Sequence, residues 1–351
     1  MSTSGELLAS TLVVEKPGML TTVQDLGRDR LGRLGVSPSG AADPLSLVIG
    51  NRLVGNPDGA AALELTLTGG TFAFPHGALI ALAGSDFGAS VGGASLPPWR
   101  SHVMMPGAVL EIGATRGGAR AYLCVAGGIR VTPVMGSAST HLLSALGGFQ
   151  GRALRKGDVI PLGSSNDRRA SRRLPAALSA ASRSLPAALS AASRSLPAVA
   201  FAALAGRAFD PPGAPKTLRV TDGPQSEHFS PRTWSVFLES PFTVSEESNR
   251  MGLRLSGPGI ATRMSGEMIS EGVSLGAIQI TPAGQPIVLF VEQQTAGGYP
   301  KIANVIGADL FRLGQLRPRD QIRFELVSIE QARALLKAQR GALTALLEPI
   351  A

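Results

Sequence analysis

The sequence predicts a mainly β protein with two related subdomains and a few helices. Glycine (43 residues) and proline (25) are abundant, and only 5% of the residues are aromatic. This composition is typical of many short strands joined by tight turns. Turn and strand motifs of the first half also recur in the second half, and 351 residues are enough for two such units.

Short apolar runs predict the strands, and capping patterns predict the helices. Strands are expected at 63–67, 79–83, 109–112, 121–126, 217–221, 287–291 and 322–327. Asp43 followed by Pro44 predicts a capped helix over 45–53. A second helix is expected over 304–316, and Ser328–Gln331 resembles a capping box that begins a helix ending at Leu347.

The two halves repeat a strand, a Gly-Gly pair and a later turn. Runs 121–126 and 287–291 are followed by Gly127-Gly128 and Gly297-Gly298, and the turns at 154–160 and 316–322 each precede a strand. We therefore expect one subdomain over 1–163, a linker over 164–215, a second subdomain over 216–330 and a C-terminal helix over 331–351.

An 11-residue repeat occupies 170–202, within the expected linker. Each copy contains a proline, at 175, 186 and 197, which opposes a continuous helix. The repeat is interpreted as a tandem duplication in a surface linker, with a functional basic arm as the alternative.

Charge and hydropathy exclude several classes of partner. Seven arginines and one aspartate between 164 and 209 account for +6 of the formal +8, so the rest of the chain is nearly neutral and no nucleic-acid partner is expected. No apolar run approaches the roughly 20 residues of a membrane span, and residues 1–8 lack a signal-peptide pattern. The single Cys124 lies in an apolar run and is expected to be a buried thiol rather than a nucleophile. We expect a cytoplasmic protein with no membrane partner.

Common catalytic motifs are absent from the sequence. There is no phosphate-binding loop, no dinucleotide fingerprint after a strand, and no Gly-x-Ser-x-Gly elbow. The four histidines lack metal-ligand spacing, so no metal site is expected. A Met-Lys-Met motif is also missing, which predicts no covalently attached biotin on this chain.

Two distant segments carry the remaining candidate chemistry, 21–28 and 294–301. Both place amide, carboxylate and cationic side chains on glycine-containing loops beside apolar runs, as in sites where loops are held by a rigid scaffold. Such groups suit recognition of an amide or urea, proton transfer and stabilisation of an oxyanion. We expect the two segments to meet in one cleft.

A long, ordered set of motifs resembles the biotin-dependent carboxyltransferase family. The motifs are 20–28, 35–43, 51–56, 63–66, 126–128, 249–255, 270–272 with 276–279, 294–303 and 309–310. The family includes the carboxyltransferase part of urea carboxylase, allophanate hydrolase subunit 2 and the C subunit of bacterial 5-oxoprolinase. The resemblance covers roughly 11–162 and 216–330. It implies a cyclophilin-like β-barrel architecture and a partner, the Kip-inhibitor-like B subunit of 5-oxoprolinase, together with an A subunit.

The resemblance also implies a small amide substrate and ATP used by the complex. The hypothesis assigns proton transfer to Asp25, Glu271 or Glu292, and charge stabilisation to Arg28 and Lys301. Other positions are assigned to substrate binding or to shaping the pocket: Gln24, Ser39, Asp43, Gln279, Gln294, Thr295 and Tyr299. One departure concerns anion recognition, because Glu292-Gln293 stands where the family usually has Asp-Arg.

Structural alternatives exist for several of these residues. Asp25 and Arg28 could pair with each other, Asp43 could serve only as a helix cap, and Tyr299 could simply pack in a turn. Glu64, inside a predicted strand, could be a structural hydrogen-bonding group.

Three functional interpretations remain open. The first is a component of a 5-oxoprolinase-type enzyme that is active only with its partners. The second is a carboxyltransferase that handles carboxybiotin and urea or a similar acceptor. The third is a non-enzymatic regulator that sequesters a Kip-inhibitor-like protein.

Overall fold

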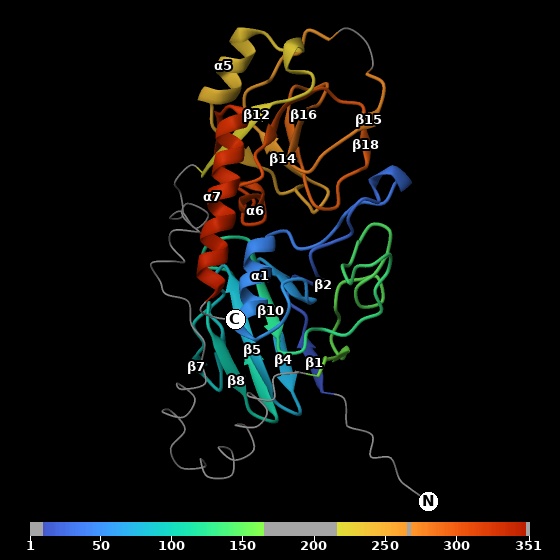
Figure 1. The fold of residues 1–351 in the computed structure, drawn as a ribbon, viewed down its shortest axis with the longest axis vertical. Helices are drawn as coiled ribbons and strands as arrows, with labels where there is room; N and C mark the ends of the chain where they lie inside the picture. The colour runs from blue at the N-terminus through green and yellow to red at the C-terminus, as the bar shows by residue number, and fades with distance from the viewer. Residues whose placement is uncertain (1–9, 165–215, 265–267, 349–351) are drawn as a thin grey trace, which may run out of the picture.

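A computed structural model of the chain describes residues 10–164, 216–264 and 268–348. These residues form two β units, one above the other in Figure 1, with one long helix running beside both. The predicted mainly β class is confirmed. The 11-residue repeat and nearly all of the predicted linker lie outside the described residues, and the predicted domain boundaries stay predictions.

The first unit contains two antiparallel sheets. One has the order β11-β1-β4-β9-β6-β7 and the other β2-β3-β10-β5-β8. Their strands are β1 (Thr11–Lys16), β2 (Leu20–Gln24), β3 (Ala62–Thr66), β4 (Thr71–Phe74), β5 (Ala78–Gly84), β6 (Ser90–Val91), β7 (Ala94–Ser95), β8 (Ser101–Met104), β9 (Ala108–Glu111), β10 (Arg120–Val125) and β11 (Val159–Pro161). A single apolar cluster, which includes Leu12, Phe72 and Leu123, draws side chains from both sheets.

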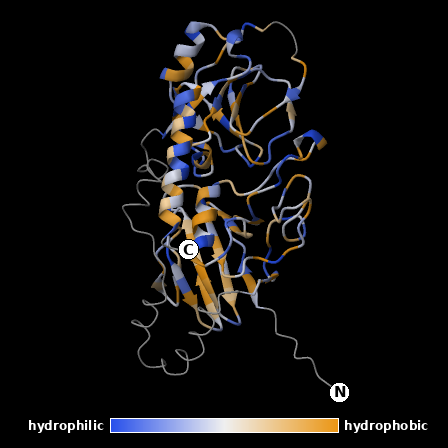
Figure 2. Ribbon diagram, in the orientation of Figure 1, coloured by the Kyte–Doolittle hydropathy of each residue, from blue (hydrophilic) through white to orange (hydrophobic). Residues whose placement is uncertain are grey.

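Strand β10 is buried along its whole length because both of its faces are covered. Leu123 and Val125 belong to the cluster between the sheets, whereas Tyr122 and Cys124 pack in a second cluster with helix α1 (Pro44–Leu53). Strands buried on both faces read as continuous apolar runs, as the 121–126 segment does. Figure 2 shows this hydrophobic centre of the lower unit in orange.

The second unit is a closed seven-stranded barrel with the order β12-β19-β16-β17-β14-β13-β20. Its strands are β12 (Lys216–Asp222), β13 (Phe242–Val244), β14 (Gly252–Ser256), β16 (Ala277–Ile280), β17 (Pro286–Leu289), β19 (Lys301–Val305) and β20 (Gln321–Leu326), and a two-stranded ribbon lies beside it, β15 (Glu271–Gly272) with β18 (Ala296–Gly297). Phe237 of helix α5 (Pro231–Glu239) stacks on Phe324 inside the barrel cluster, with ring centroids 4.5 Å apart.

The turns at 154–160 and 316–322 share one hydrogen-bond pattern. The Asp158 carboxylate accepts from the Arg155 N–H at 2.7 Å, and the Asp320 carboxylate accepts from the Arg317 N–H at 2.8 Å. In both halves the backbone carbonyl of the same aspartate also accepts a hydrogen bond from a neighbouring strand. The donor is the N–H of Val14 in the first turn and of Val244 in the second, both at 2.9 Å.

The predicted helix over 304–316 is wrong. Strand β19 continues to Val305, and only Leu310–Leu313 forms helix α6. The first residues of the segment pair with β12 and β16, so sheet pairing overrides the helical spacing of the sequence. Two further 3-10 turns, η1 (Gly32–Leu34) and η2 (Ser226–His228), complete the described elements.

The C-terminal helix α7 (Ile329–Leu347) connects the two units. Its Leu346 and Leu347 join the cluster around α1, and Gln339 donates to the carbonyl of Ala308 at 2.8 Å. The predicted capping box is present, since Ser328 and Gln331 satisfy each other's backbone N–H groups. None of the described helices is long and apolar enough to span a membrane.

We expect Ser328→Ala to lower the free energy of unfolding by about 1 kcal/mol, because one N–H group at the start of α7 loses its acceptor. Chemical denaturation would measure the change. Ser256→Ala, at an exposed serine on β14 with no side-chain hydrogen bond among the described residues, is the matched control. Equal stability of the two variants would contradict the capping role.

Candidate functional site

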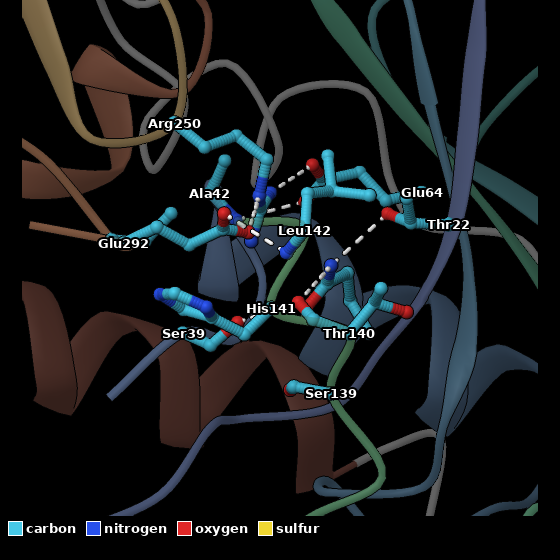
Figure 3. A network of polar contacts seen from close by, with 12 residues as sticks. Thr22, Ser39, Ala42, Glu64, Ser139, Thr140, His141, Leu142, Arg250 and Glu292 are labelled. Atoms are coloured by element: carbon cyan, nitrogen blue, oxygen red, sulfur yellow. Dashed lines mark hydrogen bonds and ion pairs between the residues drawn. The ribbon is translucent and has the colours of Figure 1, made fainter. Parts of the chain in front are cut away.

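A buried polar network joins the two units, and Arg250 is at its centre (Figure 3). The guanidinium donates through Nε to Glu292 and through Nη1 to Glu64, each at 2.5 Å, and through Nη2 to the carbonyl of Gly40 at 2.6 Å. Glu64 and Gly40 belong to the first unit, whereas Arg250 and Glu292 belong to the barrel side. The side chains of Arg250, Glu64 and Glu292 are all at most 4% exposed. One arginine therefore holds the two units together by charge-assisted hydrogen bonds.

Glu64 is a structural group, as the alternative interpretation held. It accepts from the Tyr122 hydroxyl at 2.7 Å and from the Ala42 N–H at 2.9 Å, and Arg120 lies 3.4 Å away. Burial alone would raise the pKa of Glu64, but the charges of Arg250 and Arg120 outweigh it and hold this pKa below its usual value. The carboxylate is thus kept ionised inside the protein.

Asp43 is a helix cap buried in the same junction. Its carboxylate accepts from the Ser46 N–H at 3.0 Å and from Gln315 Nε2 at 2.8 Å, and burial raises its pKa. Because Gln315 belongs to the barrel side, the cap also connects the units. These contacts leave Asp43 facing protein donors, as the structural alternative for this residue predicted.

Asp25 and Arg28 do not pair with each other within the described residues. Asp25 accepts from the Gly27 N–H, the Ser137 hydroxyl and the Ala138 N–H at 2.6–2.8 Å, and also from the Ser139 hydroxyl. Arg28 donates to the carbonyls of Val134 and Ser139. Both side chains therefore fasten segment 21–28 to the loop at 134–140 of the same unit.

The side chains of Gln24 and Ser39 are also hydrogen-bonded to this loop. The Gln24 amide donates to the carbonyl of Thr140 at 3.1 Å, and the Ser39 hydroxyl donates to the same oxygen at 2.7 Å. Gln24 is fully buried. The expectation that segments 21–28 and 294–301 line one cleft is wrong for Gln24, Asp25 and Arg28, because their side chains are bound to the loop at 134–140 of the first unit.

A cavity of the described part lies on the outer face of the barrel. It has a volume of about 480 Å³, within the usual range for small-ligand sites. It is lined by Asn249, Met251, Gly252, Arg254, Val273, Gln279, Thr281, Ile287, Leu289, Gln294, Ala296, Gly297, Gly298 and Tyr299. Three predicted residues, Gln279, Gln294 and Tyr299, meet here.

The alternation of the strands places these side chains outside the barrel. Leu253, Ile278 and Val288 belong to the barrel core, and their neighbours Arg254, Gln279 and Ile287 face the cavity. Segment 294–299 forms a second wall, where Gly297 lies so close to the Gln279 amide that an added Cβ would be 2.3 Å from Nε2.

Lys301 and Glu271 lie beside this wall, where Glu271 is the cross-strand partner of Gly297. Lys301 is the cross-strand partner of Gln279, and its Nζ is 2.8 Å from Glu271 Oε1. The hydrogen bonds from Lys301 and Gln225 lower the pKa of Glu271. Thr295 accepts from the Val273 N–H through its carbonyl and joins the ribbon to the wall. Glu292 faces the network rather than the cavity, so among the described lining residues there is no carboxylate.

Two cavity residues, Asn249 and Arg254, were not predicted as site residues, although both lie in the sequence motif 249–255. Asn249 lines the cavity, and its Oδ1 accepts from the N–H groups of Met251 and Gly252, so no described residue engages its Nδ2 donor. Arg254 alternates with Leu253 and Leu255, and this pattern was the available signal that it points outward. Among the described residues, no group of acidic, histidine or cysteine side chains is arranged to hold a metal ion.

Comparison with known proteins places the chain among carboxyltransferase-type proteins. A family model, "Carboxyltransferase domain, subdomain A and B", matches residues 34–326. The chain is 36% identical to the 5-oxoprolinase C subunit of Escherichia coli, over 94% of both chains. It is 31% identical to urea amidolyase of Saccharomyces cerevisiae over 96% of this chain but 18% of that protein.

Solved structures agree with these sequence relationships. The urea amidolyase of K. lactis superposes with a TM-score of 0.81 at 30% identity, over 97% of this chain and 20% of that one. Another solved chain is 33% identical with a TM-score of 0.73, and this chain spans 56% of its length. The architecture expected from the resemblance is therefore found in experimental structures.

We expect Glu64→Gln to lower the free energy of unfolding at neutral pH by about 3–5 kcal/mol, because Arg250 loses a buried charged partner. The pKa of Glu64 is lower in the folded protein than its usual value of 4.5, so its contribution is present above pH 4.5 and is lost as pH falls below it. The difference between wild type and variant should shrink in that range. Denaturant titrations at several pH values would measure it, with exposed Glu111→Gln as control. A pH-independent difference would refute the assignment.

Proposed function

Because the chain belongs to the family of carboxyltransferase domains with subdomains A and B, we propose that it acts as the C subunit of a 5-oxoprolinase-type complex. In this complex 5-oxoproline is opened to glutamate at the expense of ATP. The match to the 5-oxoprolinase C subunit over 94% of both chains carries the proposal. The chain spans only about a fifth of the urea amidolyases, which combine further parts.

The barrel cavity supports this proposal through its hydrogen-bonding groups. A lactam presents one N–H donor and one carbonyl acceptor in a plane. Gln279 and Gln294 offer carboxamides that no described residue engages, and Asn249 has a similarly unengaged Nδ2 donor. These side chains would bind and orient the planar amide, while Met251 and Leu289 would shield it from water.

Among the described lining residues the cavity has no carboxylate, histidine or lysine, which favours activity only with partner subunits. Glu271 and Glu292 are both bound to cations beside the walls, Lys301 and Arg250. In our proposal this chain holds the amide, and the partners that correspond to the A and B subunits supply or complete the catalytic groups and the nucleotide site. ATP would activate the lactam by phosphorylation of its oxygen when bound to the complex.

The second candidate is a carboxyltransferase of the urea carboxylase type. The superposition on urea amidolyase over 97% of this chain favours it. The same carboxamides would suit urea or the ureido ring of biotin. Release of glutamate from 5-oxoproline by the complex would distinguish the first candidate from the second.

We expect Gln294→Ala to reduce glutamate release by the reconstituted complex about tenfold at low substrate concentration, since one hydrogen bond to the amide is lost. Gln321→Ala, at an exposed glutamine of β20 away from the cavity, should leave the rate unchanged. The assay is formation of glutamate from 5-oxoproline with and without ATP. Equal rates of glutamate release by the two variants would show that Gln294 and its cavity do not take part in the proposed reaction.

A further inference from the structure

Arg254 is a cation of the barrel cavity with no counter-charge among the described residues. It is exposed on β14, and no ion pair or side-chain hydrogen bond engages its guanidinium within the described residues. The neighbouring cations are neutralised, since Arg250 is bound to Glu64 and Glu292, and Lys301 to Glu271. A free guanidinium at the edge of a cavity without carboxylates is suited to a carboxylate of a ligand.

We propose that Arg254 binds the carboxylate of the substrate, so that the cavity selects planar cyclic amides that carry a carboxylate. This inference rests on the proposed function and specifies its substrate class. Neutral amides such as urea, or a lactam without a carboxylate, would lack the group that Arg254 recognises.

The register of the barrel fixes the spacing between the two ends of the cavity. Arg254 of β14 is opposite Ile287 of β17, and Ile287 is opposite Gln279 of β16. Neighbouring strands are about 4.8 Å apart, so this row extends roughly 10 Å from backbone to backbone. A guanidinium stands at one end, an apolar side chain in the middle and a carboxamide at the other end.

This row matches the chemistry of a small carboxylated ring. The carboxylate would be held by Arg254, the aliphatic ring carbons would lie over Ile287, and the amide would meet Gln279 and Gln294. In 5-oxoproline the carbon that carries the carboxylate and the lactam carbonyl carbon flank the ring nitrogen, so the carboxylate and the carbonyl oxygen project from opposite sides of a small ring whose remaining two carbons are aliphatic. A cyclic urea with a carboxylate has the same chemistry, so the two ligand types must be distinguished by experiment.

The test uses the complete complex and compares ligands with and without the carboxylate. Binding of 5-oxoproline, 2-pyrrolidone, 2-imidazolidone-4-carboxylate and 2-imidazolidone is measured by isothermal titration calorimetry for wild type, Arg254→Ala and Arg254→Lys. Arg323→Ala, at an exposed arginine of β20 outside the cavity, is the matched control. The KM and kcat for glutamate release are measured in parallel.

We expect Arg254→Ala to weaken binding of 5-oxoproline about 10- to 100-fold and to raise its KM equally, with little change in kcat. Binding of 2-pyrrolidone should change less than about twofold, and Arg254→Lys should recover only part of the loss because it lacks the planar fork. If the complex binds the carboxylated cyclic urea more tightly than 5-oxoproline, the carboxylate that Arg254 recognises belongs to a cyclic urea rather than to a lactam.

Wild-type affinity of Arg254→Ala for both carboxylated ligands would overturn the inference, and so would a wild-type complex that binds neither of them. The proposed function fails separately, when the complex binds 5-oxoproline but forms no glutamate with ATP. If Gln294→Ala impairs turnover and Arg254→Ala does not change affinity, the proposed function stands and the carboxylate assignment is wrong.

Discussion

The buried guanidinium of Arg250 is the interaction on which the arrangement of the two units depends. Removing it would leave Glu64 and Glu292 charged and without their shared partner in a region that excludes water. Burial lowers the pKa of Arg250, and the two carboxylates more than compensate, so the arginine stays charged. The geometry is directional as well as electrostatic, because three separate nitrogens each reach a different acceptor. The network therefore fixes the relative orientation of the units, not only their proximity.

The same network supports the walls of the barrel cavity. Arg250 lies between Asn249 and Met251, both of which line the cavity, and Glu292 lies two residues before Gln294. In each loop one charged side chain is directed into the junction, and a residue one or two positions away lines the cavity. A loop held by buried ionic contacts can keep carboxamides in place for a ligand at small entropic cost. Stability of the junction and precision of the candidate site are thus coupled through adjacent residues.

Local features of the fold could be predicted from the sequence because they depend on neighbouring residues. The cap at Asp43, the capping box at Ser328 and the strand at 121–126 all have short-range causes. The network could not be predicted in this way, since Arg250 and Glu64 are 186 residues apart. Asp25 shows the same limit, because its acceptor capacity is filled by loop residues more than 110 positions away. Segments 21–28 and 294–301 have similar polar, glycine-containing sequences, but the first anchors a loop and the second forms a cavity wall. Their tertiary contacts, which the sequence does not show, determine this difference.

The distribution of charge also accounts for a division of labour within a complex. A chain that carried out the whole reaction would need a carboxylate or another proton-transfer group in its cavity. Here the two nearest carboxylates, Glu292 and Glu271, are paired with Arg250 and Lys301, and these ion pairs stabilise the walls of the cavity. The polar groups that the described residues leave free are those that recognise a ligand: the carboxamides of Gln279 and Gln294, the amide nitrogen of Asn249, the Tyr299 hydroxyl and the Arg254 guanidinium. Such a surface favours binding over chemistry. In the proposed function, a second surface would bring acid–base groups and nucleotide to the amide, and for this reason the proposal assigns the activity to the assembly and the recognition to this chain.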